Sequence, residues 1–236
     1  MIKNVIFDIG NVLVHFRFRE YMQELNMTDE QIEALAAHMI FNPIWSDLDR
    51  GARSFSDVLD ELKALHPEEA DLYDRFWADP SRLCLSYPDT RDWLLGLKKR
   101  GYRIYLLSNY PEDMFLCHWR NSFSFTDLPD GKVISYEVKL TKPEPEIYQT
   151  LFDLYHLNPV ECVYLDDRLE NVEAGRAFGM QGIWVNSGQE QAIADLEQVL
   201  AEEWVNEELE KGYEDMLAGR TKLAKEVFSK IRKDHE

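Results

Sequence analysis

The chain has 236 residues, of which 45% are hydrophobic and 30% charged, and its formal net charge is −18. This acidic balance argues against sequence-independent binding of nucleic acid and against an anionic membrane surface, because both partners require a basic face. An anionic small substrate is compatible with it, since a bound metal and local cations reverse the potential inside a pocket. No apolar stretch is long enough to span a bilayer and no signal peptide precedes the first strand, so we expect a cytoplasmic protein.

The first strand is expected over about residues 2 to 8, and a long helical insertion follows it over roughly residues 16 to 85. Apolar residues recur at helical spacing inside the insertion, behind residue types that cap helices. Helix starts are expected at Thr28, at Ser54 or Ser56, and at Pro67. We therefore predict an all-helical cap domain set into the chain after its first strand.

Beyond Pro88, helical patterns alternate with short apolar runs. The predicted elements are a helix ending at Gly101, a strand over 102–107, a helix over 145–155, a strand over 162–165, a helix over 169–178 and a strand over 182–185. Helices that alternate with buried strands imply a parallel sheet covered on both faces. We therefore predict a three-layer α/β core over residues 1–15 and 86–201, with the cap at 16–85 between its two parts.

Residues 202–236 form a charged extension after the last predicted strand, acidic from 202 to 215 and basic from 220 to 233. This order of charges suits a helix dipole, whereas Gly212 and Gly219 are expected to weaken or break the helix. An apolar stripe at helical spacing also runs along it. We expect the extension to be a helix docked on the sheet or on a second subunit.

Four polar motifs lie where predicted strands or their loops end. Asp8 follows Val5–Phe7, Ser108 follows Tyr105–Leu107, Lys142 precedes Pro143, and the pair Asp166 and Asp167 follows Val163–Leu165. Open α/β sheets bind their ligands at the carboxyl ends of parallel strands. One site is therefore predicted to gather all four motifs.

The residue types at these positions indicate phosphoryl transfer. Asp8 is a candidate nucleophile, because a carboxylate can form a covalent intermediate that water later hydrolyses. Adjacent carboxylates at Asp166 and Asp167 require a cation, and their oxygen ligands favour Mg²⁺. Lys142 supplies a point charge for a phosphate and Ser108 a hydroxyl donor. Positioning and charge neutralisation of this kind account for most of the catalysis of phosphoryl transfer.

The motifs resemble those of the haloacid dehalogenase superfamily over about residues 2 to 186. The resemblance rests on Phe7-Asp8-Ile9-Gly10-Asn11-Val12, Leu107-Ser108-Asn109, Lys142-Pro143-Glu144-Pro145-Glu146-Ile147-Tyr148 and Leu165-Asp166-Asp167-Arg168-Leu169-Glu170-Asn171-Val172-Glu173-Ala174-Gly175. The first motif and the insertion look most like the branch that contains alpha-glucose-1-phosphate phosphatases with a helical cap. The resemblance implies a Rossmann-like core, a mobile cap and Mg²⁺-dependent hydrolysis of a phosphomonoester through an aspartyl-phosphate.

The resemblance also implies roles for individual residues. Asp8 would be the nucleophile, Lys142 the stabilising cation of the catalytic pair, and Ser108 the phosphate-binding hydroxyl. Asn109 and Asn11 would face the phosphate pocket. The Mg²⁺ site would be formed by Asp8, the main-chain carbonyl of Gly10 and Asp167 as direct ligand, with Asp166 close by and Asn171 outside it.

Gly10 departs from the family pattern, because most phosphatases of this superfamily carry there a second Asp that protonates the leaving oxygen. General acid–base help of this kind is typically worth about 10²–10⁴-fold in rate. The gap leaves three outcomes open: a substrate with a better leaving group such as an anomeric sugar phosphate, a proton path through a cap residue, Asn11 or the substrate, or slow turnover. Haloacid dehalogenases also lack the second Asp, but their counterpart of Asp166 and Asp167 lacks the acidic metal-binding pair. A non-catalytic protein that binds a phosphorylated metabolite is the further alternative.

Substrate choice is expected to rest with the cap, and the substrate is expected to be a small phosphorylated metabolite such as a sugar phosphate. Phe16, Arg17, Phe18 and Arg19 lie at its expected entry, and Trp45, Asp47, Asp49 and Arg50 precede Gly51. Aromatic and charged groups in such a mixture are typical of sugar pockets. The competing interpretation is that the aromatic residues form the small core of the cap and that the charges mark a turn.

Overall fold

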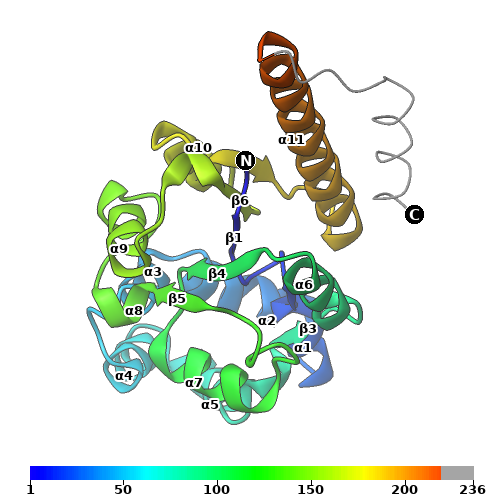
Figure 1. Cartoon of the computed structure of the whole chain (residues 1–236). Helices are drawn as coiled ribbons and strands as arrows, with labels where there is room; N and C mark the ends of the chain where they lie inside the picture. Colours follow the sequence, from blue (N-terminus) through cyan, green and yellow to red (C-terminus); the bar gives the residue numbers. More distant parts are fainter. Residues whose placement is uncertain (219–236) are drawn as a thin grey trace. The chain divides into compact units, whose positions relative to one another are not determined.

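The computed structural model describes residues 1–218 and centres on a five-stranded sheet with the strand order β5-β4-β1-β6-β7 (Figure 1). All its described strand pairs are parallel. The strands are β1 (Asn4–Phe7), β4 (Arg103–Ser108), β5 (Gly131–Ile134), β6 (Cys162–Asp166) and β7 (Gln181–Trp184). Because β1 lies between β4 and β6, Asp8 follows the central strand, with the ends of its neighbours on both sides.

Helices cover both faces of this sheet, as alternating side chains of β1 show. Ile6 packs in a buried cluster with Tyr105, Tyr164 and residues of α9 (Pro145–Tyr155). Phe7 points to the other face, where its ring meets Trp93 of α6 (Thr90–Lys99) edge-on at a centroid distance of 5.0 Å. The predicted three-layer α/β fold is therefore confirmed.

The predicted helices and strands of the core are present within a few residues, and others were not predicted. The predicted helix over 169–178 is α10 (Leu169–Ala177), and the core also contains α7 (Glu112–Asn121) and α8 (Ser135–Val138). α7, α8 and β5 were not predicted. β5 is short and contains a lysine, so it lacks the continuous apolar run that marks the central strands.

The chain enters and leaves the helical insertion side by side. β2 (Val14–Phe16) and β3 (Cys84–Ser86) pair antiparallel, with His15 opposite Leu85. These two strands lie at the boundaries predicted for the cap. Between them are α1 (Phe18–Glu24), α2 (Asp29–Leu35), the π-helix η1 (Ala36–Ile40), α3 (Pro43–Asp49), α4 (Phe55–Leu65), the 3₁₀ turn η2 (Pro67–Glu69), α5 (Ala70–Trp77) and the 3₁₀ turn η3 (Pro80–Arg82).

Two of the predicted helix starts have the expected capping contacts. The Thr28 hydroxyl accepts from the backbone of Gln31, whose side chain accepts from the backbone of Thr28, which is a complete capping box. Ser54 caps α4 by accepting from the backbone of Asp57. α1 and α3 were not predicted, and α3 begins with Asn42 accepting from the backbone of Ile44.

The described part of the chain divides into two units, residues 2–195 and Met1 with the residues from Leu196 onward. α11 (Gln189–Leu217) runs through Gly212, so the glycine does not break the helix there, which was one of the two expected effects. One glycine costs a helix about 1 kcal/mol, which the good helix formers around it offset. Gly219 and the basic stretch lie outside the described residues. None of the described helices combines the length and hydrophobicity needed to cross a membrane.

Candidate active site

The polar motifs meet at the carboxyl edge of the sheet, as their strand positions predict. Phe7 is paired with Leu106 on one side and with Leu165 on the other. Asp8 directly follows Phe7, the last residue of β1, and its backbone N–H donates to the Leu165 carbonyl at 2.9 Å. Ser108 ends β4 and is almost fully buried. The structure therefore brings the first, second and fourth motifs to one edge.

Lys142 connects two of these motifs through buried ion pairs. Its Nζ lies 2.8 Å from Asp8 Oδ1 and 2.6 Å from Asp166 Oδ2. Its side chain is only 1% exposed, so both contacts are shielded from water. The Asn109 side chain holds the Lys142 backbone, accepting from its N–H at 2.8 Å and donating to its carbonyl at 3.0 Å. Asn109 thus positions the lysine as well as lining the cavity described below.

Both carboxylate oxygens of Asp166 are already engaged. Oδ2 accepts from Lys142 Nζ and from the Tyr164 hydroxyl. Oδ1 accepts from the Arg168 backbone N–H at 2.8 Å and from Asn171 Nδ2 at 3.0 Å. Asp166 is fully buried, so this carboxylate is better suited to orienting Lys142 than to direct contact with a ligand. The contact with Asn171 agrees with the supporting position that the motif implied for it.

Asn11 contacts the acidic pair in a way that the sequence did not reveal. Its Nδ2 donates to Asp167 Oδ2 at 2.8 Å, and its Oδ1 accepts from the Phe16 backbone at 3.2 Å. The backbone of Asn11 is left-handed, with φ at 55°, a conformation that asparagine tolerates better than most residues. The Asn11 amide therefore orients Asp167 and shapes the turn, and its role towards phosphate stays a prediction.

Three carboxylates compete for one ammonium in this site. Oxygens of Asp8, Asp166 and Asp167 lie within 4.8 Å of one another. Burial raises the pKa of Asp8 to about 7, and the charges of Asp166 and Asp167 add to the rise although Lys142 opposes it. Burial likewise raises the pKa of Asp167. The surplus of two negative charges and the all-oxygen donor set fit a hard divalent cation, which Asp8, Asp167 and the carbonyl of Gly10 would hold.

A cavity of about 110 Å³ opens in front of Asp8 and is lined by residues of both the α/β core and the helical insertion. The core contributes Asp8, Gly10, Asn11, Asn109, Tyr110, Pro111, Met114 and Asp167, and the insertion contributes Phe16, Trp45, Asp49 and Cys84. Trp45 and Asp49 thus lie where a substrate pocket was expected, whereas Asp47 lines a different cavity. Tyr110 and Met114 were missed, although Tyr110 directly follows the second motif.

A family model for haloacid dehalogenase-like hydrolases matches residues 2–179. This chain belongs to that family. The predicted enzyme class, a hydrolase, is thereby confirmed. The match spans both the strand that precedes Asp8 and the helix that follows Asp166 and Asp167.

Three similar proteins show the range of chemistry around this chain. D-ribitol-5-phosphate phosphatase from Bacteroides thetaiotaomicron is 28% identical over 202 residues, covering 80% of this chain and 94% of that protein. (S)-2-haloacid dehalogenase 4A from Burkholderia cepacia is 28% identical over 126 residues, covering 53% and 54%. A family enzyme from B. thetaiotaomicron, solved with magnesium and inorganic phosphate, shares the fold with a TM-score of 0.64 at 22% identity, covering 78% of this chain and 94% of that chain.

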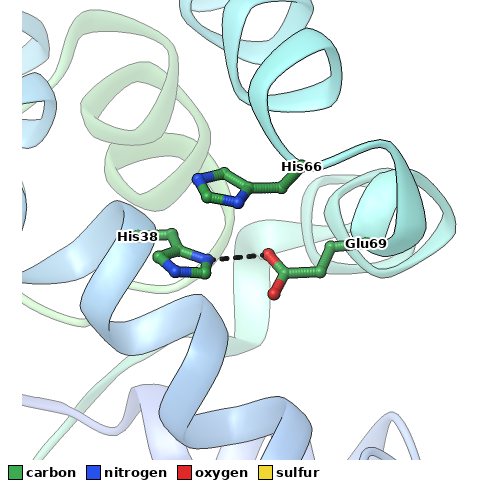
Figure 2. A group of neighbouring side chains, drawn as sticks. All are labelled: His38, His66 and Glu69. Atoms are coloured by element: carbon green, nitrogen blue, oxygen red, sulfur yellow. Dashed lines mark hydrogen bonds and ion pairs between the residues drawn. The ribbon is translucent and has the colours of Figure 1, made fainter.

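A second group of potential metal ligands, His38, His66 and Glu69, lies within the insertion (Figure 2). His38 Nδ1 is 3.0 Å from Glu69 Oε2, and the His38 and His66 rings stack at 3.7 Å with 8° between their planes. Ring nitrogen lone pairs lie in the ring planes, so the lone pairs of two parallel stacked rings do not meet at one ion. The Tyr73 hydroxyl also donates to Glu69 Oε2, at 2.7 Å. We therefore interpret this group as a packing contact that joins η1, α4 and η2.

Proposed function

We propose that this protein is a Mg²⁺-dependent phosphomonoester hydrolase that acts on a small phosphorylated metabolite, such as a sugar or polyol phosphate, through an aspartyl-phosphate on Asp8. The observation that carries the proposal is the cluster of Asp8, Asp166 and Asp167 around Lys142. A nucleophilic carboxylate beside a second carboxylate that requires a cation is suited to the attack on an anionic phosphate ester, whose charge the cation offsets.

Each of the clustered residues has its own role in the proposed reaction. Lys142 neutralises Asp8 and donates to a phosphoryl oxygen in the proposed reaction, while the ion pair with Asp166 keeps it in place. Asp8 attacks phosphorus, and the Ser108 hydroxyl at the end of β4 donates to a phosphoryl oxygen. Bound Mg²⁺ supplies further neutralisation of the phosphoryl charge. The cavity walls formed by the insertion exclude water from the covalent intermediate.

The relatives support the substrate class and the metal. The relative from B. thetaiotaomicron is named for a phosphorylated polyol, and the solved family enzyme was crystallised with magnesium and inorganic phosphate. A cytoplasmic location, the absence of a nucleic-acid partner and the division into core and cap stay predictions.

Dehalogenation is the second candidate, because position 10 lacks a carboxylate and a haloacid dehalogenase is among the relatives. The two reactions differ in what they require of the acidic pair. Displacement of halide from carbon needs no divalent cation, whereas the surplus charge of Asp166 and Asp167 does. We therefore favour phosphate ester hydrolysis.

A screen for phosphate release and halide release tests the assignment. Sugar phosphates, polyol phosphates, nucleotides and 2-haloacids are assayed with Mg²⁺ and with EDTA, using the natural chain, Asp8→Asn, and Asp153→Asn as an exposed control on α9. We expect phosphate release that needs Mg²⁺, disappears in Asp8→Asn and is unchanged in Asp153→Asn. Halide release that survives EDTA would instead establish a dehalogenase, and Mg²⁺-dependent binding without turnover would establish a binding protein.

A further inference from the structure

The proposed reaction lacks a proton donor at Gly10. A side chain there would have room, since a Cβ built on Gly10 meets no atom within 4 Å. Alkoxide leaving groups are strongly basic and need a proton as the bond to phosphorus breaks. For such a leaving group, another acid that lines the cavity is the natural candidate for the donor.

The cavity contains one further carboxyl group, which comes from the insertion. Among its described lining residues the carboxylic acids are Asp8, Asp167 and Asp49. Asp8 and Asp167 are committed to the nucleophile and cation positions. Asp49 is the last residue of α3 and is half-buried, and within residues 1–218 its backbone carbonyl accepts from the Ser135 hydroxyl while its carboxylate has no hydrogen-bond partner. Its side chain is thus available to a ligand.

The backbone around Asp49 is fixed to the segment that carries Lys142. Arg50 forms a two-pronged ion pair with Glu144 and donates to the Thr141 hydroxyl at 2.8 Å. The Ser135 hydroxyl donates to the Asp49 carbonyl, and Lys139 Nζ donates to the Gly51 carbonyl at 2.7 Å. These contacts tie the end of α3 to residues on both sides of Lys142, in and beside the loop over 139–144 that is called the Lys142 loop below. Because Lys142 pairs with Asp8, the contacts also fix the position of Asp49 relative to Asp8.

The surroundings of Asp49 favour its protonated form near neutral pH. Burial raises the pKa of Asp49 to about 7, with a further rise from Asp8, while Lys142 and Arg168 oppose it. Asp49 also interacts with Tyr110, and burial holds the pKa of that phenol well above its usual range. An acid of this strength can both give and take a proton at neutral pH.

We propose that Asp49 is the general acid and base of the reaction, acting from the insertion in place of the side chain that Gly10 lacks; the inference rests on the proposed phosphatase function. As Asp8 Oδ bonds to phosphorus and the bond to the leaving oxygen breaks, the Asp49 proton passes to that oxygen and an alcohol departs. The Asp49 carboxylate then takes a proton from the water that attacks the aspartyl-phosphate. The bond from phosphorus to Asp8 breaks, phosphate leaves and both side chains return to their first state.

Leaving-group dependence tests this role, because a weakly basic leaving group needs no proton. Asp49→Asn is compared with the natural chain on nitrophenyl phosphate and on the best alkyl or sugar phosphate, with Asp47→Asn as a control on the same helix. We expect kcat for the alkyl ester to fall about 10²–10⁴-fold in Asp49→Asn, with little change for nitrophenyl phosphate or in Asp47→Asn. Retained Mg²⁺-dependent hydrolysis of nitrophenyl phosphate shows that the variant is folded and that the proposed function holds.

Adding the missing carboxylate provides a second test. Because position 10 is open, Gly10→Asp is expected to restore alkyl-ester turnover to the Asp49→Asn variant. Equal losses on both esters, or a rise in KM alone, would make Asp49 a substrate-binding residue and overturn the proposal. A natural chain that hydrolyses nitrophenyl phosphate but no alkyl ester would also overturn it, leaving the phosphatase assignment intact. A chain that hydrolyses neither ester would refute the phosphatase itself.

Discussion

Replacing Lys142 with methionine should expose the repulsion among the buried carboxylates. The substitution keeps an unbranched side chain but removes the ammonium that lies 2.8 Å from Asp8 and 2.6 Å from Asp166. Removing one partner of a buried ion pair typically costs about 3–5 kcal/mol. We expect a loss of this size in the free energy of unfolding at about pH 8 without Mg²⁺, because the Lys142 side chain is 1% exposed and water offers little screening.

The loss should shrink at lower pH. Burial raises the pKa of Asp8 to about 7, so this group stabilises the fold while protonated and loses that contribution as pH rises through about 7. Lys142 lowers that pKa, and removing it raises the folded-state pKa of Asp8 further. The difference between variant and natural chain should therefore be larger at about pH 8 than at about pH 5.

Urea unfolding at both pH values, with Mg²⁺ and with EDTA, measures these effects. Mg²⁺ should stabilise Lys142→Met more than the natural chain, because the cation then meets the same carboxylates without a competing ammonium. Lys98→Met is the control, since its ion pair with Asp130 is about one-third exposed and should be worth under about 1 kcal/mol. A loss that is independent of both pH and Mg²⁺ would show that Lys142 acts through packing alone.

Two further predictions concern the insertion. Arg50→Met should cost only about 1 kcal/mol of stability, since its ion pair with Glu144 is about one-third exposed. The substitution should nevertheless lower kcat for alkyl esters more than kcat for nitrophenyl phosphate. Arg53→Met, which removes the ion pair with Glu61, is the control, and equal losses on both esters would contradict a role of Arg50 in positioning Asp49. For Glu69, burial opposes ionisation but the hydrogen bonds from His38 and Tyr73 outweigh it and hold its pKa below its usual value. The contribution of ionised Glu69 to stability is therefore present above the pKa of the unfolded state and is lost as the pH falls. Glu69→Gln should cost about 1–3 kcal/mol at neutral pH and progressively less below about pH 4, as measured by thermal unfolding. A loss of stability that persists unchanged in acid would refute this prediction.

The central part of the site could be predicted because the burial of each strand is visible in the sequence of that strand alone. β1, β4 and β6 are buried on both faces, so they appear in the sequence as continuous apolar runs. The polar residue that ends such a run must lie at the carboxyl edge. The positions of Asp8 and of the pair Asp166 and Asp167 at this edge therefore follow from the strands alone, without any knowledge of tertiary contacts.

The rest depended on contacts between distant segments. Asn11 was assigned to phosphate, yet a left-handed turn directs its amide to Asp167, which is 156 residues away in sequence. The contact of Asn109 with Lys142 likewise joins two loops. For Asp49, the sequence favoured a turn beside Gly51 over a place in a pocket. Only the packing of α3 against the Lys142 loop separates the two.

The placement of the acid on the insertion has a consequence for how the reaction is gated. A proton donor at position 10 would be rigidly attached to the nucleophile strand and present whether or not the insertion is seated. Asp49 is held instead by Arg50, whose contacts to Glu144 and Thr141 are partly solvent-exposed and can be broken at modest cost. If these contacts open to admit substrate, proton donation is restored only when they re-form. Alkyl esters would then be cleaved only in the closed, water-excluding state, and the aspartyl-phosphate would meet its base under the same condition.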